Sequence, residues 1–183
     1  MQIMRISKVE REIILTLSEL REANLRDMAQ RLGLDIRSIV GHTLNMRKKG
    51  YLTRLHGGLY ALTDKGEALL RDLQARKERA SKILGEVPFD RGFHFYKALG
   101  QYTGLTALSL EEFQKILKNL EMASLEFHLM RGDFESWIQS LGDEFLAERI
   151  GRIRKEGLKG DEALRALSEA IEARIRELKA ELQ

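Results

Sequence analysis

Aromatic, histidine and arginine side chains that could bind a small molecule gather in the second half of the chain. Ten of the twelve Phe, Trp and Tyr residues follow residue 86. The candidates for a pocket are His94, Tyr96, Tyr102, His128, Arg131, Asp133 and Trp137. An arginine can bind an anionic group through two parallel hydrogen bonds, and aromatic rings can form stacking walls. These residues therefore suit a pocket for a small polar or anionic effector.

The same residues also fit a purely structural role. In that interpretation the rings form a core, His128 is a hydrogen-bonded core histidine, and Arg131 pairs with Asp133 or Asp143. A metal site built from His94, His128 and a carboxylate is not expected, because the four His show no tight ligand spacing and the chain has no Cys. No cofactor is expected either.

A second set of residues, in the first half of the chain, could contact nucleic acid. The side chains that helical periodicity leaves off the apolar face of residues 36–49 are Arg37, Ser38, Gly41, His42, Asn45, Lys48 and Lys49. Asparagine can pair with adenine, arginine with guanine and serine with a base or a phosphate, and glycine lets a helix backbone come close. Lys48, Lys49 and Arg54 are expected to contact phosphates, which supply affinity without sequence information. His56 fits either a phosphate contact or a turn beside two glycines.

Capping residues mark the helices that must position this second set. Ser7 and Glu10 match an S-x-x-E capping box, and Asn24 and Asp35 are N-cap residues. The helices are expected over residues 7–20, 25–32 and 36–49. The inner face of the third is expected to hold Ile36, Ile39, Val40, Thr43, Leu44 and Met46.

Two strand-like runs follow, over residues 51–55 and 59–62 around a His-Gly-Gly turn, and a further helix begins within residues 63–67. The order α-α-α-β-β-α, with the segments KKGYL and GGLYALTDKGEALL, resembles the winged helix-turn-helix family of archaeal and bacterial transcription regulators, including the MarR-like and PadR-like groups, over residues 7–75. The resemblance implies that the third helix enters the major groove of double-stranded DNA and that the hairpin wing touches the adjacent backbone. The alternative is a protein-interaction adaptor whose winged helix binds a protein partner.

The second half predicts a second, all-helical domain. Ser109 and Glu112 match a capping box, which predicts a helix from Leu110. Further helices are expected from Ser124 and from Asp133, which can cap the helix that carries Trp137. The segments FHFY, YTG, SLEEF and SLEFHLMRGDFESWI resemble an uncharacterised family of prokaryotic domains over residues 89–155, and that family brings no known activity. From Asp161 onward a helix carries an apolar stripe, which fits either a homodimer interface or a cover for the core of its own chain.

Charge and composition divide the chain and narrow its function. Residues 1–85 carry 17 Lys and Arg against 10 Asp and Glu, and residues 86–183 carry 14 against 18. A basic first half indicates a polyanionic partner. With Pro88 ending a charged helix, we expect a winged-helix domain over 1–85 and a helical domain for dimerisation or ligand sensing over 86–183. The charged fraction of 32 % is typical of thermophilic proteins.

The sequence argues against a membrane protein, a secreted protein and an enzyme. No apolar stretch approaches the roughly 18–20 residues of a membrane span, and the first residues lack the pattern of a secretory signal, so a cytoplasmic protein without membrane contact is expected. No nucleophile elbow or phosphate-binding loop is present, and an enzyme is not expected. The sequence predicts a mainly α, DNA-binding transcriptional regulator, homodimeric, with a small-molecule effector as a further partner.

Overall fold

The computed structural model describes residues 6–182 and shows a mainly helical chain, as the sequence predicts. It also contains two small antiparallel sheets. The chain divides into two compact units between Ala75 and Arg76, inside the helix α4 (Asp64–Leu84). The sequence-based prediction placed the boundary ten residues later, between residues 85 and 86. Ala80 and Ile83, in the last turns of α4, already lie in the core of the second unit.

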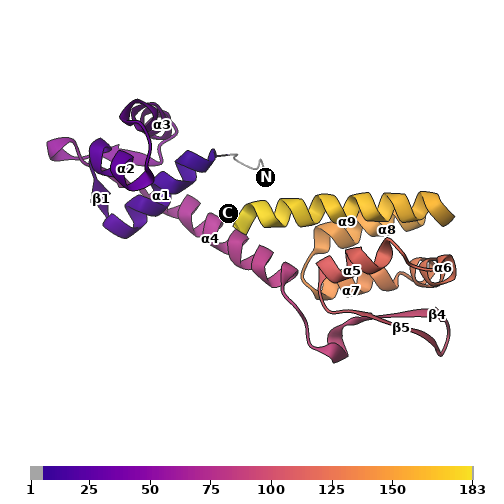
Figure 1. Cartoon of the computed structure of the whole chain (residues 1–183). Helices are drawn as coiled ribbons and strands as arrows, with labels where there is room; N and C mark the ends of the chain where they lie inside the picture. Colours follow the sequence, from indigo (N-terminus) through magenta and orange to yellow (C-terminus); the bar gives the residue numbers. More distant parts are fainter. Residues whose placement is uncertain (1–5, 183) are drawn as a thin grey trace. The chain divides into compact units, whose positions relative to one another are not determined.

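The first unit packs three helices against a three-stranded sheet (Figure 1). Its elements are α1 (Lys8–Leu20), β1 (Glu22–Ala23), α2 (Leu25–Leu32), α3 (Ile36–Lys48), β2 (Leu52–Arg54), β3 (Tyr60–Leu62) and the first turns of α4. The strand order is β1-β3-β2, with antiparallel pairing throughout, and Thr53 lies opposite Ala61. The two-residue strand β1 is too short to be recognised from sequence pattern, and it was not predicted.

Local hydrogen bonds explain where these helices begin. The Ser7 hydroxyl accepts from the Glu10 N–H at 3.2 Å while the Glu10 carboxylate accepts from the Ser7 N–H at 2.8 Å, which confirms the capping box. Asn24 caps α2 through the N–H groups of residues 26 and 27, and Asp35 caps α3 through the Arg37 N–H. Such contacts involve residues two or three positions apart, so the sequence alone was sufficient to predict them.

The core of the first unit contains only part of the predicted inner face of α3. Ile39, Thr43 and Met46 are buried, and Val40 is half-buried. The prediction that Ile36 and Leu44 lie in the core is wrong, because their side chains are 45 % and 46 % exposed. The apolar stripe of α3 is therefore narrower than the periodicity indicated, and two large apolar side chains remain on its surface.

The turn between β2 and β3 lies at the His-Gly-Gly segment, as predicted. A single 3-10 turn spans His56–Gly58, and Gly57 and Gly58 have φ of 71° and 79°. This left-handed region is costly for residues with a Cβ atom, so the glycines are required by the turn itself. The strands on either side are shorter than expected.

The second unit is not all-helical, which corrects the sequence-based prediction. After the last turns of α4, β4 (Phe93–Ala98) and β5 (Gln101–Ala107) form an antiparallel hairpin. Phe93 and Phe95 are buried while His94 and Tyr96 are half-buried, which is the period-two pattern of a strand. The turn holds Leu99 and Gly100, with Gly100 at φ 75°. This alternation was the available signal for a hairpin.

Five helices complete the second unit (Figure 1). They are α5 (Leu110–Leu117), α6 (Met122–Arg131), α7 (Asp133–Ser140), α8 (Glu144–Lys155) and α9 (Gly160–Leu182). Ser109 caps α5 as predicted. Asp133 does not cap α7: the N-cap is Gly132, at φ 76°, and the Asp133 carboxylate binds other side chains. Nor does α6 begin at Ser124, which is buried inside it.

The apolar stripe of α9 belongs to the core of its own chain. Leu167, Ala170 and Ile171 are at most 1 % exposed, and Leu178 is 3 % exposed, in a cluster shared with α5, α6 and α8. This settles the two interpretations of the stripe in favour of intramolecular packing. Within residues 6–182, no helix is both long enough and apolar enough to cross a membrane.

Candidate functional sites

The predicted nucleic-acid contacts lie on α3 and on the β2–β3 turn, mostly in exposed positions. On α3, Arg37, Ser38, Gly41, Asn45 and Lys48 are exposed, whereas His42 and Lys49 are half-buried. On the hairpin, Arg54 and His56 are exposed. The sequence therefore assigned the polar surface of α3 correctly in outline.

Two members of that set are already bound within the chain. Glu10 of α1 is only 4 % exposed, and its Oε1 accepts from Asn45 Nδ2 at 2.8 Å and from Lys49 Nζ at 3.0 Å. Burial alone would raise the pKa of Glu10, but hydrogen bonds from the Ser7 N–H, Lys49 and Asn45 hold that pKa below its ordinary value. The ionised carboxylate thus joins α1 to α3, and Asn45 and Lys49 position the helix.

A residue that sequence reasoning did not select, Arg47, lies beside the hairpin. It lines an open groove with Glu22, Arg54, Leu55 and His56. The signal for Arg47 was weak, because it is one of three consecutive basic residues and only its place on the helix separates it from Lys48 and Lys49. The groove brings two arginines and a histidine from α3 and the hairpin together.

In the second unit, a hollow of about 350 Å³ lies between the β4–β5 hairpin and α6. Five of the seven predicted pocket residues line it: His94, Tyr96, His128, Arg131 and Asp133. The remaining lining residues are Gly92, Phe93, Ala98, Leu99, Gly100 and Phe127. Sequence reasoning missed these, since the hairpin that supplies most of them was read as helix.

Two predicted residues are not among those that line the hollow. Trp137 is 8 % exposed in the core, stacks on Phe113 at 5.2 Å between ring centroids, and donates from Nε1 to the Arg91 carbonyl oxygen at 3.0 Å. Tyr102 is 45 % exposed on β5, and its hydroxyl lies 2.6 Å from Thr106 Oγ1. Thr106 Oγ1 is also 2.8 Å from His94 Nδ1, so these three side chains form one polar chain across the hairpin.

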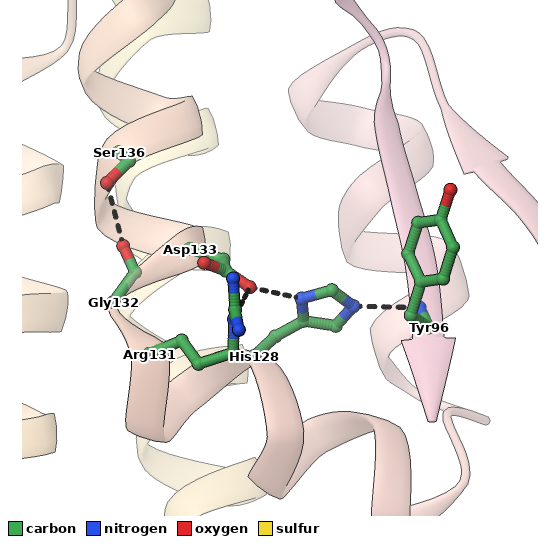
Figure 2. Close-up of polar contacts among 6 residues, drawn as sticks. All are labelled: Tyr96, His128, Arg131, Gly132, Asp133 and Ser136. Atoms are coloured by element: carbon green, nitrogen blue, oxygen red, sulfur yellow. Dashed lines mark hydrogen bonds and ion pairs between the residues drawn. The ribbon is translucent and has the colours of Figure 1, made fainter. Parts of the chain in front are cut away.

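His128 is held on both ring nitrogens (Figure 2). The Tyr96 backbone N–H donates to Nε2 at 2.8 Å, so Nε2 carries no proton. Nδ1 therefore carries the proton and donates it to Asp133 Oδ2 at 2.8 Å. Burial lowers the pKa of His128, and Asp133 opposes that shift only in part. The neutral imidazole ties β4 to α6 and α7, which supports the interpretation of His128 as a hydrogen-bonded core histidine.

Arg131 and His128 meet on the same oxygen of Asp133 (Figure 2). Arg131 Nε donates to Oδ2 at 3.1 Å, and the guanidinium carbon lies 5.0 Å from the ring centroid of Phe127. The predicted pairing of Arg131 with an aspartate is thus confirmed for Asp133. Asp143 is instead paired with Arg174, at 2.7 Å. Among residues 6–182, no group of three His, Asp or Glu side chains could hold a metal ion.

The chain belongs to the family of unknown function DUF5752, which it matches over residues 61–172. The matched segment begins in β3 and ends in α9, so it contains the hairpin, the hollow and the His128 network. A search of curated proteins and a search of solved structures each found no match to the chain.

Proposed function

We propose that the first unit is a winged helix-turn-helix that binds double-stranded DNA, and that the chain is a transcriptional regulator. The element order from α1 to α4 and the sheet order β1-β3-β2 support this arrangement. The αL residue Gly33 ends α2 three residues before α3 begins, as in a helix-turn-helix. In this proposal α3 enters the major groove and the β2–β3 turn is the wing.

The observation that carries the proposal is Gly41 in the middle of α3. It is exposed, its φ is not in the left-handed region, and a Cβ atom at this position would meet nothing within 4 Å. Glycine inside a helix costs about 0.5–1 kcal/mol relative to alanine. Since no contact within the chain requires the missing Cβ, a close approach of α3 to a partner outside the chain explains it.

The charges around Gly41 indicate a polyanion as that partner. Arg37, Arg47, Lys48 and Arg54 are exposed, and none of them forms an ion pair with another residue in the range 6–182. In the proposal Arg37, with Ser38, reads base edges near the start of α3. Lys48, Arg47 and Arg54 contact phosphates, and His56, in the wing itself, lies against the DNA backbone.

Two exposed apolar side chains favour a second candidate, a protein-interaction adaptor. Ile36 and Leu44 are 45 % and 46 % exposed on the same helix. Aliphatic side chains can contact a thymine methyl group, but two on one face also suit a protein partner. The basic residues around them make DNA the better supported partner.

The two candidates predict different responses to salt. The full chain is titrated onto fluorescent random-sequence duplex DNA at several salt concentrations. If DNA is the partner, the logarithm of the binding constant falls linearly with the logarithm of salt, with a slope of about −0.9 per phosphate contacted. Lys48→Ala should weaken all sequences and make the slope about one unit shallower, whereas Arg37→Ala should reduce discrimination between sites.

Lys159→Ala is the matched control, because Lys159 is exposed in the second unit. It should leave binding unchanged. Affinity that does not depend on salt, or equal losses from Lys48→Ala and Lys159→Ala, would contradict the DNA proposal. The adaptor would be supported if the chain binds a protein partner with an affinity that does not depend on salt, and if Leu44→Ser abolishes that binding.

The remaining parts of the proposal follow from DNA binding. In this proposal the chain is not an enzyme, and it acts in the cytoplasm, where a prokaryotic chromosome lies. It acts as a homodimer, which would place two α3 helices on two half-sites of the DNA. The apolar stripe of α9 is not available for such a dimer, because it is buried in its own unit. A dimer interface must therefore use other surfaces.

A further inference from the structure

The hollow beside the β4–β5 hairpin is built from both apolar and charged side chains, and the proposed DNA-binding unit contributes none of them. Its volume of about 350 Å³ lies at the lower end of the range for small-molecule sites. The lining is mostly apolar, and the charged side chains in it are Arg131 and Asp133. A ligand of matching chemistry therefore has a large apolar body and a small polar end.

The apolar wall contains a side chain that the fold itself does not use. Leu99, at the tip of the hairpin, is 85 % exposed although it lines the hollow together with Tyr96 and Phe127. Leaving a leucine in water forgoes the favourable free energy of its burial. A ligand lying against Tyr96 and Phe127 would cover Leu99 and recover part of that free energy.

The polar end of the hollow is an arginine that is already fixed in place. Arg131 Nε is bonded to Asp133, and its guanidinium lies over the Phe127 ring. Among the residues that the structure describes, neither Nη atom of Arg131 has a hydrogen-bond partner. Because the side chain is held on two sides, binding a carboxylate there costs less conformational entropy than ordering a free arginine.

The charge of Asp133 limits which anion fits. Its carboxylate lies against the same guanidinium, so the pair carries no net charge. A singly charged carboxylate gains two hydrogen bonds from the Nη atoms, and Asp133 repels it less strongly than it repels a multiply charged anion such as phosphate.

We propose that this hollow binds a small monocarboxylic acid with a large apolar body, with its carboxylate on the Nη atoms of Arg131 and its body against Tyr96, Leu99 and Phe127. A simple carboxylic acid and an α-amino acid share this chemistry. The site does not depend on whether the first unit binds DNA, and it is tested without DNA.

Three probes that share a phenylethyl group separate the possible sources of the ligand. Binding of 3-phenylpropionate, L-phenylalanine and 2-phenylethylamine to the full chain is measured by calorimetry and by NMR shifts of the His94 ring. The first two carry the carboxylate, and only the last two carry an amine. Binding of 3-phenylpropionate alone identifies a simple acid, and binding of both carboxylates identifies an acid with or without an α-amino group. Inorganic phosphate should not bind.

Variants tie the binding to the proposed residues. Arg131→Gln and Leu99→Ala should each lower the affinity for the two carboxylate probes. The loss from Arg131→Gln should be about tenfold or more. Leu99 is so exposed that its replacement leaves the fold intact, which keeps the test valid if Arg131→Gln disturbs Asp133. Arg149→Gln, at an exposed position of α8 that does not line the hollow, is the matched control and should bind as the parent does.

Three outcomes would overturn the proposal. The first is that neither carboxylate binds at millimolar concentration. The second is that 2-phenylethylamine binds as well as 3-phenylpropionate, because the carboxylate would then contribute nothing. The third is that Arg131→Gln and Leu99→Ala bind as tightly as Arg149→Gln.

Discussion

Replacing Gly41 with alanine should stabilise the protein and weaken its binding to DNA. The site lies inside α3, is exposed, and leaves open space for a Cβ atom. Alanine should therefore raise the free energy of unfolding of the first unit by about 0.5–1 kcal/mol. For a unit of this size, that gain corresponds to an increase in Tm of roughly 2–8 °C.

The expected loss of DNA affinity comes from the same methyl group. If the helix backbone at Gly41 lies against the edge of the groove, a methyl group keeps α3 away from the bases. Losing one well-formed base contact costs about 1–3 kcal/mol, which is roughly a 5-fold to 150-fold loss of affinity. Unfolding cannot explain a weaker complex here, because the variant is expected to be the more stable protein.

The assay can separate the two units by their chromophores. Trp137 is the only Trp of the chain and lies in the core of the second unit, so its fluorescence follows that unit, whereas helical circular dichroism follows both. The unfolding transition that is seen by circular dichroism but not by Trp fluorescence belongs to the first unit. Gly41→Ala should shift this transition to higher temperature. Gly33→Ala, where φ is 63°, is the control and should lower stability by about 1 kcal/mol. A Gly41→Ala protein with unchanged DNA affinity would refute the proposed close approach, and a less stable one would refute the assignment of open space.

Two further predictions concern the second unit. Burial lowers the pKa of His128 in the folded state below the unfolded value near 6.5, so the unfolded state takes up the extra proton first as pH falls. The free energy of unfolding should therefore decrease as pH drops below about 6.5, by at most about 1.4 kcal/mol per pH unit. Denaturant unfolding of the parent and of His128→Gln at pH 7 and pH 5 measures this, and equal pH dependence in both would contradict it. Ile171→Glu with Leu178→Glu should unfold the second unit, since each buries an unpaired charge at a cost of about 3–5 kcal/mol. Light scattering together with Trp137 fluorescence decides, and a double variant that remains folded would contradict the buried position of this stripe.

The sequence predicted most helix starts because capping is local. The Ser7 and Glu10 pair, Asn24, Asp35 and Ser109 each bond to a backbone group within three residues. Asp133 shows the limit of that reasoning. It follows a glycine as an N-cap residue would, but its carboxylate is bound by His128, five residues earlier on another helix, and by Arg131. A side chain that can cap a helix also has tertiary partners, which the local pattern does not contain.

The hairpin was missed for a related reason. Residues 93–96 alternate buried phenylalanines with half-buried side chains, and residues 93–107 contain few charges. The capped helices that follow led to the prediction that the whole half is helical. The pocket residues were nevertheless chosen by chemistry, and five of the seven line one hollow. Residue types at a site can therefore be recognised even where the backbone that carries them is assigned wrongly.

The polar side of α3 shows why periodicity alone does not define a binding surface. Periodicity separates the apolar stripe of α3 from its polar side chains. Some of those polar side chains are bound within the chain, and others are open to solvent. Glu10 decides between them: its Oε2 closes the capping box with Ser7, and its Oε1 binds Asn45 and Lys49 from 35 and 39 positions away. The residues beside α1 are thereby engaged within the chain, and those around Gly41 remain open to a partner. One glutamate that the sequence identified for its local role thus also determines which face of α3 is engaged within the chain and which face the proposed DNA complex would use.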